Sequence, residues 1–261
     1  MHTALTIAGS DPSGGAGIQG DLKTFHAQGV YGMAVLTALT VQNTRGVTGV
    51  HDVPAEFVAA QLRAVLEDMP VGAAKTGMVS VTATIEAIAD VLARQRVPHL
   101  VVDPVMVSTS GDALLHDDAV SAMVERLFPL ATVITPNIPE AERLLDRTIR
   151  TPEQMRSAAV ALKELGAAAV LLKGGHLEGP QLIDLLYFDG GFREFSDPRI
   201  DTPHTHGTGC AFAAGVAAQL ACGAQLPEAV SRARDFVRRG LERAVPLGRG
   251  ASPINHLAAG G

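Results

Sequence analysis

The feature that most constrains the fold of this chain is the alternation of short apolar segments with longer amphipathic ones. The apolar segments have the length of strands, and the segments between them have helical periodicity. We expect strands at residues 3–8, 31–41, 73–76, 100–102, 132–134 and 168–172, and helices near residues 15–28, 54–69, 81–96 and 116–128, with two more opening at Pro139 and at Thr151-Pro152. This alternation predicts a parallel sheet, because parallel neighbours need a crossover connection such as a helix.

The last third of the chain departs from this alternation. Residues 182–188 and 192–195 are expected to form an antiparallel pair joined at Asp189-Gly190-Gly191, and two helices follow from about Gly209 and Pro227. No linker, internal repeat or low-complexity tract divides the sequence. We therefore predict one domain, residues 1–261, of the α/β class: a three-layer, doubly wound, mostly parallel sheet with helices on both faces.

Composition narrows the classes of function. Hydrophobic residues make up 47% of the chain but aromatic residues only 4%, so the core must consist of small aliphatic side chains. The net charge is −6 and no cluster of Lys and Arg is visible, which argues against nucleic-acid binding. Two cysteines outside any Cys-x-x-Cys pair, no signal-peptide pattern and no apolar run long enough for a bilayer favour a cytoplasmic protein without membrane contact.

Two familiar nucleotide motifs do not apply. Residues 15–20 formally match Gly-x-Gly-x-x-Gly, but no acidic residue stands at the end of the second strand to bind a ribose. A Walker A loop is excluded because Gly-Lys-Ser and Gly-Lys-Thr are absent.

A second glycine-rich segment is more informative. Gly207-Thr208-Gly209-Cys210 precedes a run of small residues with helical character. Backbone N–H groups at a helix start can bind an anion, and phosphoryl transfer needs such donors. The alternative, a glycine-rich turn that leads into a tightly packed helix, fits this segment equally well.

Charged residues follow three of the predicted strands. Asp103 follows residues 100–102, Glu140 lies shortly after residues 132–134, and Lys173 ends the strand at 168–172. Mg²⁺ accepts one or two carboxylates beside water and phosphate oxygens, and a lysine at a ligand-binding edge suits phosphate. The alternatives are solvated acids, helix capping by Asn137 and a solvated lysine. His204, His206 and Cys210 offer only three of the four ligands that structural zinc requires.

These residues together resemble the hydroxymethylpyrimidine kinase and phosphomethylpyrimidine kinase family of thiamine biosynthesis, within the ribokinase-like superfamily. The resemblance rests on segments that occur in the family's order across nearly the whole chain: residues 8–19, 21–24, 40–44, 75–78, 103–106, 136–140, 173–176, 205–210 and 253–256. It implies a sheet without a separate lid domain, a homodimer, and ATP and Mg²⁺ as co-substrate and cofactor. It also implies transfer of phosphoryl groups to 4-amino-5-hydroxymethyl-2-methylpyrimidine and then to its monophosphate.

The resemblance also implies roles for particular residues. Those around the small-molecule pyrimidine substrate would be Gly9, Asp21, Gln42, Met78 and Val105. Asp103 and Glu140 would serve the metal, while Lys173, Asn137 and Thr208 would contact ATP phosphates. The backbone of Gly207, Thr208, Gly209 and Cys210 would form the anion hole, and Cys210 would face the substrate hydroxyl.

Simple chemistry makes two of these roles reasonable. The carboxamide of Gln42 offers a donor and an acceptor that complement an aminopyrimidine edge. A helix N-terminus can lower the pKa of a thiol such as Cys210, which could then accept the alcohol proton. The rival function is that of a pyridoxal or pyridoxine kinase, some of which also carry cysteine at this position. A ligand-binding protein without catalysis would be expected to lack the phosphate and metal groups that are present here.

Overall fold

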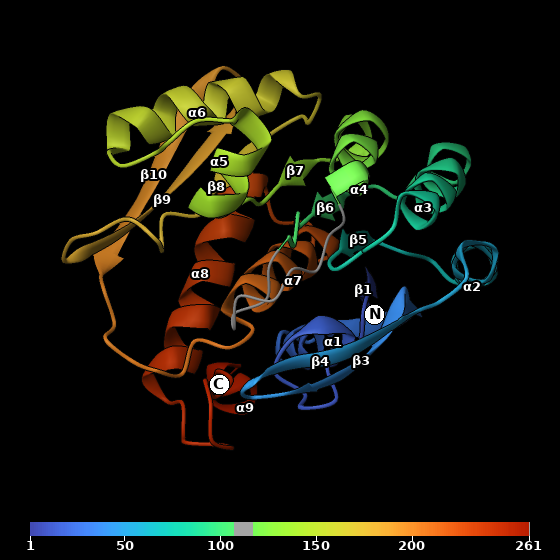
Figure 1. Ribbon diagram of the computed structural model, residues 1–261, viewed down its shortest axis with the longest axis horizontal. Coiled ribbons are helices and arrows are strands. Elements are labelled where there is room, and N and C mark those ends of the chain that lie inside the picture. Colours follow the sequence, from blue (N-terminus) through green and yellow to red (C-terminus); the bar gives the residue numbers. More distant parts are fainter. Residues whose placement is uncertain (107–116, 261) are drawn as a thin grey trace.

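The computed structural model describes residues 1–106 and 117–260, which form an eight-stranded sheet with helices on both faces (Figure 1). The strand order is β10-β9-β8-β7-β6-β5-β1-β2. The bounds of these strands are β1 Thr3–Ala8, β2 Tyr31–Leu36, β5 Ala73–Thr76, β6 Leu100–Val102, β7 Val133–Ile134, β8 Val170–Leu172, β9 Gln181–Phe188 and β10 Gly191–Pro198. Strands β1, β2, β5, β6, β7 and β8 are parallel, and β9 and β10 complete the sheet in antiparallel fashion.

Two layers of helices cover the sheet. The helices have the bounds α1 Gly17–Ala27, α2 Ala55–Asp68, α3 Thr82–Arg94, α4 Asp117–Ala122, α5 Ile138–Leu145, α6 Pro152–Glu164, α7 Thr208–Ala221, α8 Leu226–Glu242 and α9 His256–Ala259. A hydrophobic core lies on each face of the sheet. Successive side chains of β1 point to opposite faces, so Leu5 and Ile7 belong to one core cluster and Ala4 to the other. The first cluster includes residues of α2, α3 and α6, and the second includes residues of α1, α7 and α8.

This architecture confirms the predicted fold class, and no separate lid domain is present among residues 1–106 and 117–260. The predicted strands 3–8, 73–76 and 100–102 have the predicted bounds. The antiparallel pair is also confirmed: β9 and β10 meet at Asp189 and Gly190, both with positive φ, as a two-residue hairpin turn requires. Within the described residues, no helix combines the length and apolar character needed to cross a membrane.

The single strand predicted at residues 31–41 is wrong. The chain leaves the main sheet after β2 and begins β3, Ala38–Asn43, which pairs with β4, Gly46–Asp52, in a separate two-stranded sheet. Thr37 marks the change of direction: its N–H donates to Ala8 and its buried hydroxyl to the Met78 carbonyl. No local signal predicts this turn, because residues 33–41 contain neither glycine nor proline.

The helix predicted at residues 116–128 is not regular. His116 lies outside the described residues, α4 ends at Ala122, and the chain continues as a π-helical turn, η1 at Met123–Leu127, and a 3₁₀ turn, η2 at Phe128–Leu130. Pro129 lacks the backbone N–H that an α-helix would need at this position, which explains why α-helix does not resume in η2.

Candidate active site

The carboxyl ends of the parallel strands open into a cavity of about 620 Å³. Ligands of such sheets bind at this edge. The residues that were predicted to act and that line the cavity are Gly9, Gln42, Met78, Asp103, Val105, Asn137, Glu140, Lys173, Gly207, Thr208, Gly209 and Cys210. Of the predicted site residues, only Asp21 is not among the lining residues.

Lys173 and Asp103 form an ion pair in the cavity wall. The Lys173 Nζ lies 2.8 Å from the Asp103 Oδ1, and the side chains are only 11% and 2% exposed. The Thr135 hydroxyl also donates to the Asp103 Oδ1, at 2.8 Å. Adjacent strand ends create this contact, because β6, β7 and β8 are neighbours in the sheet.

Glu140 joins this group through a helix cap. The Asn137 side chain accepts from the Glu140 N–H at 2.9 Å, and the Glu140 Oε2 accepts from the Asn137 N–H at 2.8 Å. This reciprocal capping box begins α5 and confirms the capping alternative for Asn137, which also lines the cavity. Burial, together with the nearby Asp103 carboxylate, raises the pKa of Glu140 to about 7, in spite of the opposing effect of Lys173.

The carboxyl groups of this cluster are candidate ligands for a cation. The carboxyl groups of Asp103 and Glu140 are both buried and both interact with the ammonium of Lys173. Among residues 1–106 and 117–260, no three His, Cys, Asp or Glu side chains gather as a metal cage. The pair instead matches Mg²⁺, which takes few carboxylates and keeps phosphate and water oxygens as its other ligands.

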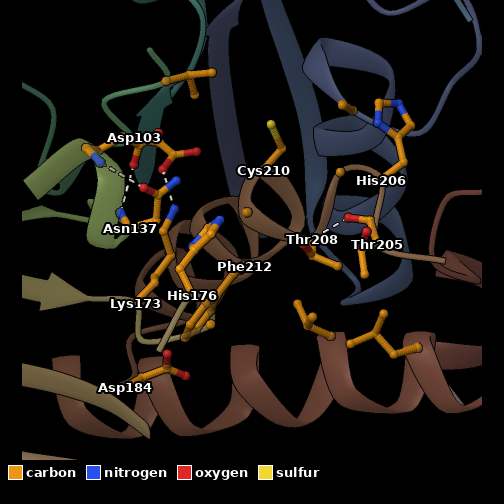
Figure 2. Close-up of a pocket in the computed structure, with 18 of the residues that line it drawn as sticks. Asp103, Asn137, Lys173, His176, Asp184, Thr205, His206, Thr208, Cys210 and Phe212 are labelled. Atoms are coloured by element: carbon orange, nitrogen blue, oxygen red, sulfur yellow. Dashed lines mark hydrogen bonds and ion pairs between the residues drawn. The ribbon is translucent and has the colours of Figure 1, made fainter. Parts of the chain in front are cut away.

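The N-terminus of α7 lies beside Lys173 and carries Cys210 (Figure 2). Gly207 caps the helix with φ 76°, and a Cβ at this position would collide with the Gly15 carbonyl oxygen. No side chain caps the first turn and no acid occupies it. The Lys173 Nζ lies 3.5 Å from the point where a Cβ on Gly209 would be. The positive potentials of the Lys173 ammonium and of the α7 N-terminus therefore add at the same place in the cavity.

The expected lowering of the Cys210 pKa is wrong. Burial raises the pKa of the thiol, although the nearby Lys75 ammonium and a hydrogen bond from the Gly17 N–H act in the opposite direction. Asp21 and Asp103 raise it further. The helix start alone cannot offset the loss of water, so the thiol is protonated near neutral pH.

Asp21 lies behind the cavity rather than in its lining. Its carboxylate receives the Lys75 Nζ at 2.9 and 3.1 Å and the Thr6 hydroxyl at 2.6 Å, and both charged side chains are fully buried. Burial would lower the pKa of Lys75, but the combined effects of Asp21, Cys210 and Asp103 outweigh it and the pKa is raised. Direct contact between Asp21 and a pyrimidine does not follow from this position.

Lys75, Asp11 and His206 also line the cavity, although none of them was predicted as a site residue of a kinase. Lys75 is the charged member of β5, a strand of four buried residues, and that placement is the signal that could have revealed it. Asp11 and His206 contact each other across the cavity wall, with 2.7 Å between Oδ2 and Nε2. His206 was considered only as a zinc ligand, and its distance of 195 residues from Asp11 hides the pair from sequence reasoning.

Gln42 reaches the cavity from the β3–β4 hairpin. The ladder shifts register between Val41 and Gln42, which is a β-bulge, and bulges redirect side chains. The Gln42 amide oxygen lies 3.3 Å from the Thr40 hydroxyl, which also donates to the Ser10 carbonyl at 2.9 Å. Gln42 is therefore held by its own hairpin and still lines the pocket.

A parallel sheet, a phosphate-suited helix start and a Lys–carboxylate cluster define a kinase of the ribokinase-like superfamily. Residues 11–255 match the family model described as phosphomethylpyrimidine kinase. The chain belongs to this family.

Three relatives show the extent of the similarity. A hydroxymethylpyrimidine/phosphomethylpyrimidine kinase of Rhizobium meliloti is 53% identical, with 97% of this chain and 96% of the relative covered. The thiamine biosynthesis bifunctional protein ThiED of Geobacter sulfurreducens is also 53% identical over 98% of this chain, which spans only 52% of that longer protein. The ADP complex of Bacillus subtilis pyridoxal kinase superposes with a TM-score of 0.92 at 40% identity, covering 99% and 98% of the two chains.

Proposed function

We propose that this protein transfers the γ-phosphoryl group of ATP to the hydroxymethyl group of 4-amino-5-hydroxymethyl-2-methylpyrimidine, and then phosphorylates the monophosphate to the diphosphate, in thiamine biosynthesis. The observation that carries the proposal is the convergence of the Lys173 ammonium on the start of α7, beside Cys210. That arrangement suits the negative charge of a transferring phosphoryl group. Gly9, Gln42, Met78 and Val105 supply the pyrimidine side of the same cavity.

Asp103 and Glu140 would hold Mg²⁺, which neutralises charge on the ATP phosphates when it is bound. Lys173 would hold the transferred phosphoryl group, with Thr208 and Asn137 near the ATP phosphates. The apolar wall that Phe212, Val237 and Leu241 contribute to the cavity would accept the base of the nucleotide.

Cys210 would orient the hydroxyl of the substrate. Because its thiol is protonated, we assign it a hydrogen-bonding role rather than that of the base. A loose phosphoryl-transfer transition state tolerates this, since the alcohol proton leaves late and can pass to the phosphoryl oxygens.

We also propose that the whole chain works as a single kinase domain in a cytoplasmic homodimer. The exposed Leu39 and Val41 of the β3–β4 hairpin, 47% and 66% exposed, support a surface that pairs with a second copy. The free thiols of Cys210 and Cys222 fit a reducing compartment.

The direct test is ATP consumption with a panel of alcohols: the hydroxymethylpyrimidine, its monophosphate, pyridoxal and a sugar. We expect turnover with the first two and much weaker turnover with the others. The similarity to the B. subtilis pyridoxal kinase makes pyridoxal phosphorylation the second candidate. If kcat/KM were higher for pyridoxal than for both pyrimidines, the proposed function would be wrong and the protein would be a pyridoxal kinase.

Replacing Cys210 by alanine should lower kcat by at most about a hundredfold and leave the KM for ATP unchanged, because the thiol orients only the alcohol. Cys210→Ser, which keeps a hydrogen-bonding group, should retain more of the rate. Steady-state kinetics of both variants separates the roles. If serine were as poor as alanine, hydrogen bonding by Cys210 could not explain the loss.

Asp103→Asn and Glu140→Gln should each raise the Mg²⁺ concentration needed for half-maximal rate by about tenfold or more, because each removes a charge that faces the cation. Both substitutions keep the oxygen that accepts the existing hydrogen bond from Thr135 or Asn137. Magnesium titrations of the rate make the comparison, with Glu164→Gln at the exposed end of α6 as the control. Identical titration curves for wild type and the three variants would show that Asp103 and Glu140 do not bind the cation.

Gln42→Leu should reduce the preference for the pyrimidine over pyridoxal by about ten- to a hundredfold. An unpaired buried polar group costs about 1–3 kcal/mol, and pyridoxal lacks the amine that would pair with the amide oxygen. The ratio of kcat/KM for the two substrates is the measurement, and Asn43→Ala, exposed on the same hairpin, is the control. An unchanged ratio would show that Gln42 does not discriminate between the pyrimidine and pyridoxal rings.

A further inference from the structure

The pair formed by Asp11 and His206 has no part in the functions assigned so far. The His206 Nε2 lies 2.7 Å from the Asp11 Oδ2, and the two side chains are 8% and 1% exposed. Asp11 follows β1, whereas His206 directly precedes the start of α7. The contact therefore joins two segments that are 195 residues apart in the sequence, at the wall of the proposed active site.

On one side of the contact, the Asp11 carboxylate organises the loop that leads into α1. Its Oδ1 accepts from the N–H and the hydroxyl of Ser13, at 2.9 and 2.6 Å. Its Oδ2 accepts from the Ala16 N–H at 2.8 Å and from the Gly15 N–H at 3.2 Å. Although burial opposes ionisation, the bonds from His206, Ser13 and Ala16 lower the pKa of Asp11 to about 2. The charged carboxylate is therefore the centre of this loop, and the ring of His206 contacts it from a segment 195 residues away in the sequence.

On the other side, His206 fixes the segment that begins α7. Its backbone N–H donates to the Ser252 carbonyl at 3.2 Å, and its ring lies against Gly15. The next residue, Gly207, packs so closely on the Gly15 carbonyl that a side chain would not fit. The starts of α1 and α7 are thus in contact at this point, beside the Asp11–His206 hydrogen bond.

Cys210 depends on this contact between the two helix starts. Gly17 is the first residue of α1, and its N–H lies close enough to Cys210, in the first turn of α7, to lower the pKa of the thiol. Figure 2 shows Cys210 between His206 on one side and the cluster of Asp103, Asn137 and Lys173 on the other. A shift of α1 relative to α7 would move both the sulfur and the backbone donors of residues 207–210.

We propose that the Asp11–His206 pair is a positioning device for phosphoryl transfer, which holds the start of α1 against the start of α7 so that Cys210 and the anion hole keep their alignment. The inference rests on the proposed kinase function. The pair acts through Cys210 and the 207–210 backbone and contacts neither of the reacting atoms. A misplacement of about 1 Å at such a site can cost about a hundredfold in rate.

The test compares His206→Leu, His206→Gln, Asp11→Asn and the double variant His206→Leu/Asp11→Asn with wild type, in kcat, in both KM values and in Tm. The amide of glutamine can donate to Asp11 much as the ring Nε2 does, whereas leucine cannot. We expect kcat to fall about ten- to a hundredfold in His206→Leu and in Asp11→Asn, with both KM values within about twofold of wild type. His206→Gln should stay within about threefold of the wild-type rate, and the double variant should be no slower than the slower single variant.

Three results would overturn the proposal: an unchanged kcat in His206→Leu, equal impairment of the Leu and Gln variants, or a kcat effect in the double variant equal to the product of the single effects. If His206→Leu does not fold, Asp11→Asn makes the same test, and an unchanged kcat in that folded variant overturns the idea. Turnover of the pyrimidine alcohol by wild type reports on the proposed function, while the ratio of variant to wild type reports on the pair. Failure of the proposed function and failure of the proposed role of the pair can therefore be distinguished.

Discussion

Lys75→Met should lower the free energy of unfolding by about 3–5 kcal/mol, because it leaves the carboxylate of Asp21 buried without a counter-charge. Both side chains of this pair are fully buried, and within residues 1–106 and 117–260 the only other side-chain group bonded to Asp21 is the Thr6 hydroxyl. Urea unfolding followed by circular dichroism measures the change. Typical stabilities are about 5–15 kcal/mol, so the predicted loss is a large fraction of the total and is readily measured.

Two further variants show whether the buried charge is the cause. Lys75→Met/Asp21→Leu removes both charges and should recover to within about 1–3 kcal/mol of wild type, the remaining loss being the acceptor of the Thr6 hydroxyl. Arg126→Met breaks a surface pair with Asp90, whose side chains are 44% and 58% exposed, and should cost less than about 1 kcal/mol. A double variant as unstable as the single one would contradict the electrostatic explanation.

Lys173→Met should lower kcat by about a hundred- to a thousandfold, even at saturating Mg²⁺. The ammonium lies beside the start of α7, where the transferring phosphoryl group would carry its charge. Removal of one such charge-stabilising donor has that magnitude in other enzymes. Methionine keeps the length of the side chain, so packing against the strand end changes little. Single-turnover kinetics with saturating ATP, pyrimidine and magnesium gives the rate of transfer directly.

Lys163→Ala, in the last turn of α6 and outside the cavity lining, is the matched control and should keep the wild-type rate. Lys173→Met also leaves Asp103 without its ammonium partner. The variant Lys173→Met/Asp103→Asn therefore tests whether the loss comes from the unpaired carboxylate. If that variant regained the wild-type rate, Lys173 would act only by neutralising Asp103.

Features that depend on residues near in sequence could be predicted, whereas features that depend on distant residues could not. Asp103, Glu140 and Lys173 could be placed near one another from the sequence, because the carboxyl ends of parallel strands share one edge of the sheet. The capping box of Asn137 and Glu140 and the turn at Asp189-Gly190 could be predicted for a similar reason: each depends on neighbouring residues. Residues 31–41 failed as one strand because the turn at Thr37 depends on bonds to Ala8 and Met78, not on its own neighbours.

The sequence by itself therefore determined the class of fold, the family and the strand ends at which chemistry could occur, since periodicity and local motifs carry that information. Only the tertiary structure decided which charges are satisfied. It placed Asp21 behind the cavity with Lys75, 54 residues away, and joined Asp11 to His206 across 195 residues. It also reversed the expected direction of the Cys210 pKa, because burial depends on what packs around a group and not on where it lies along the chain.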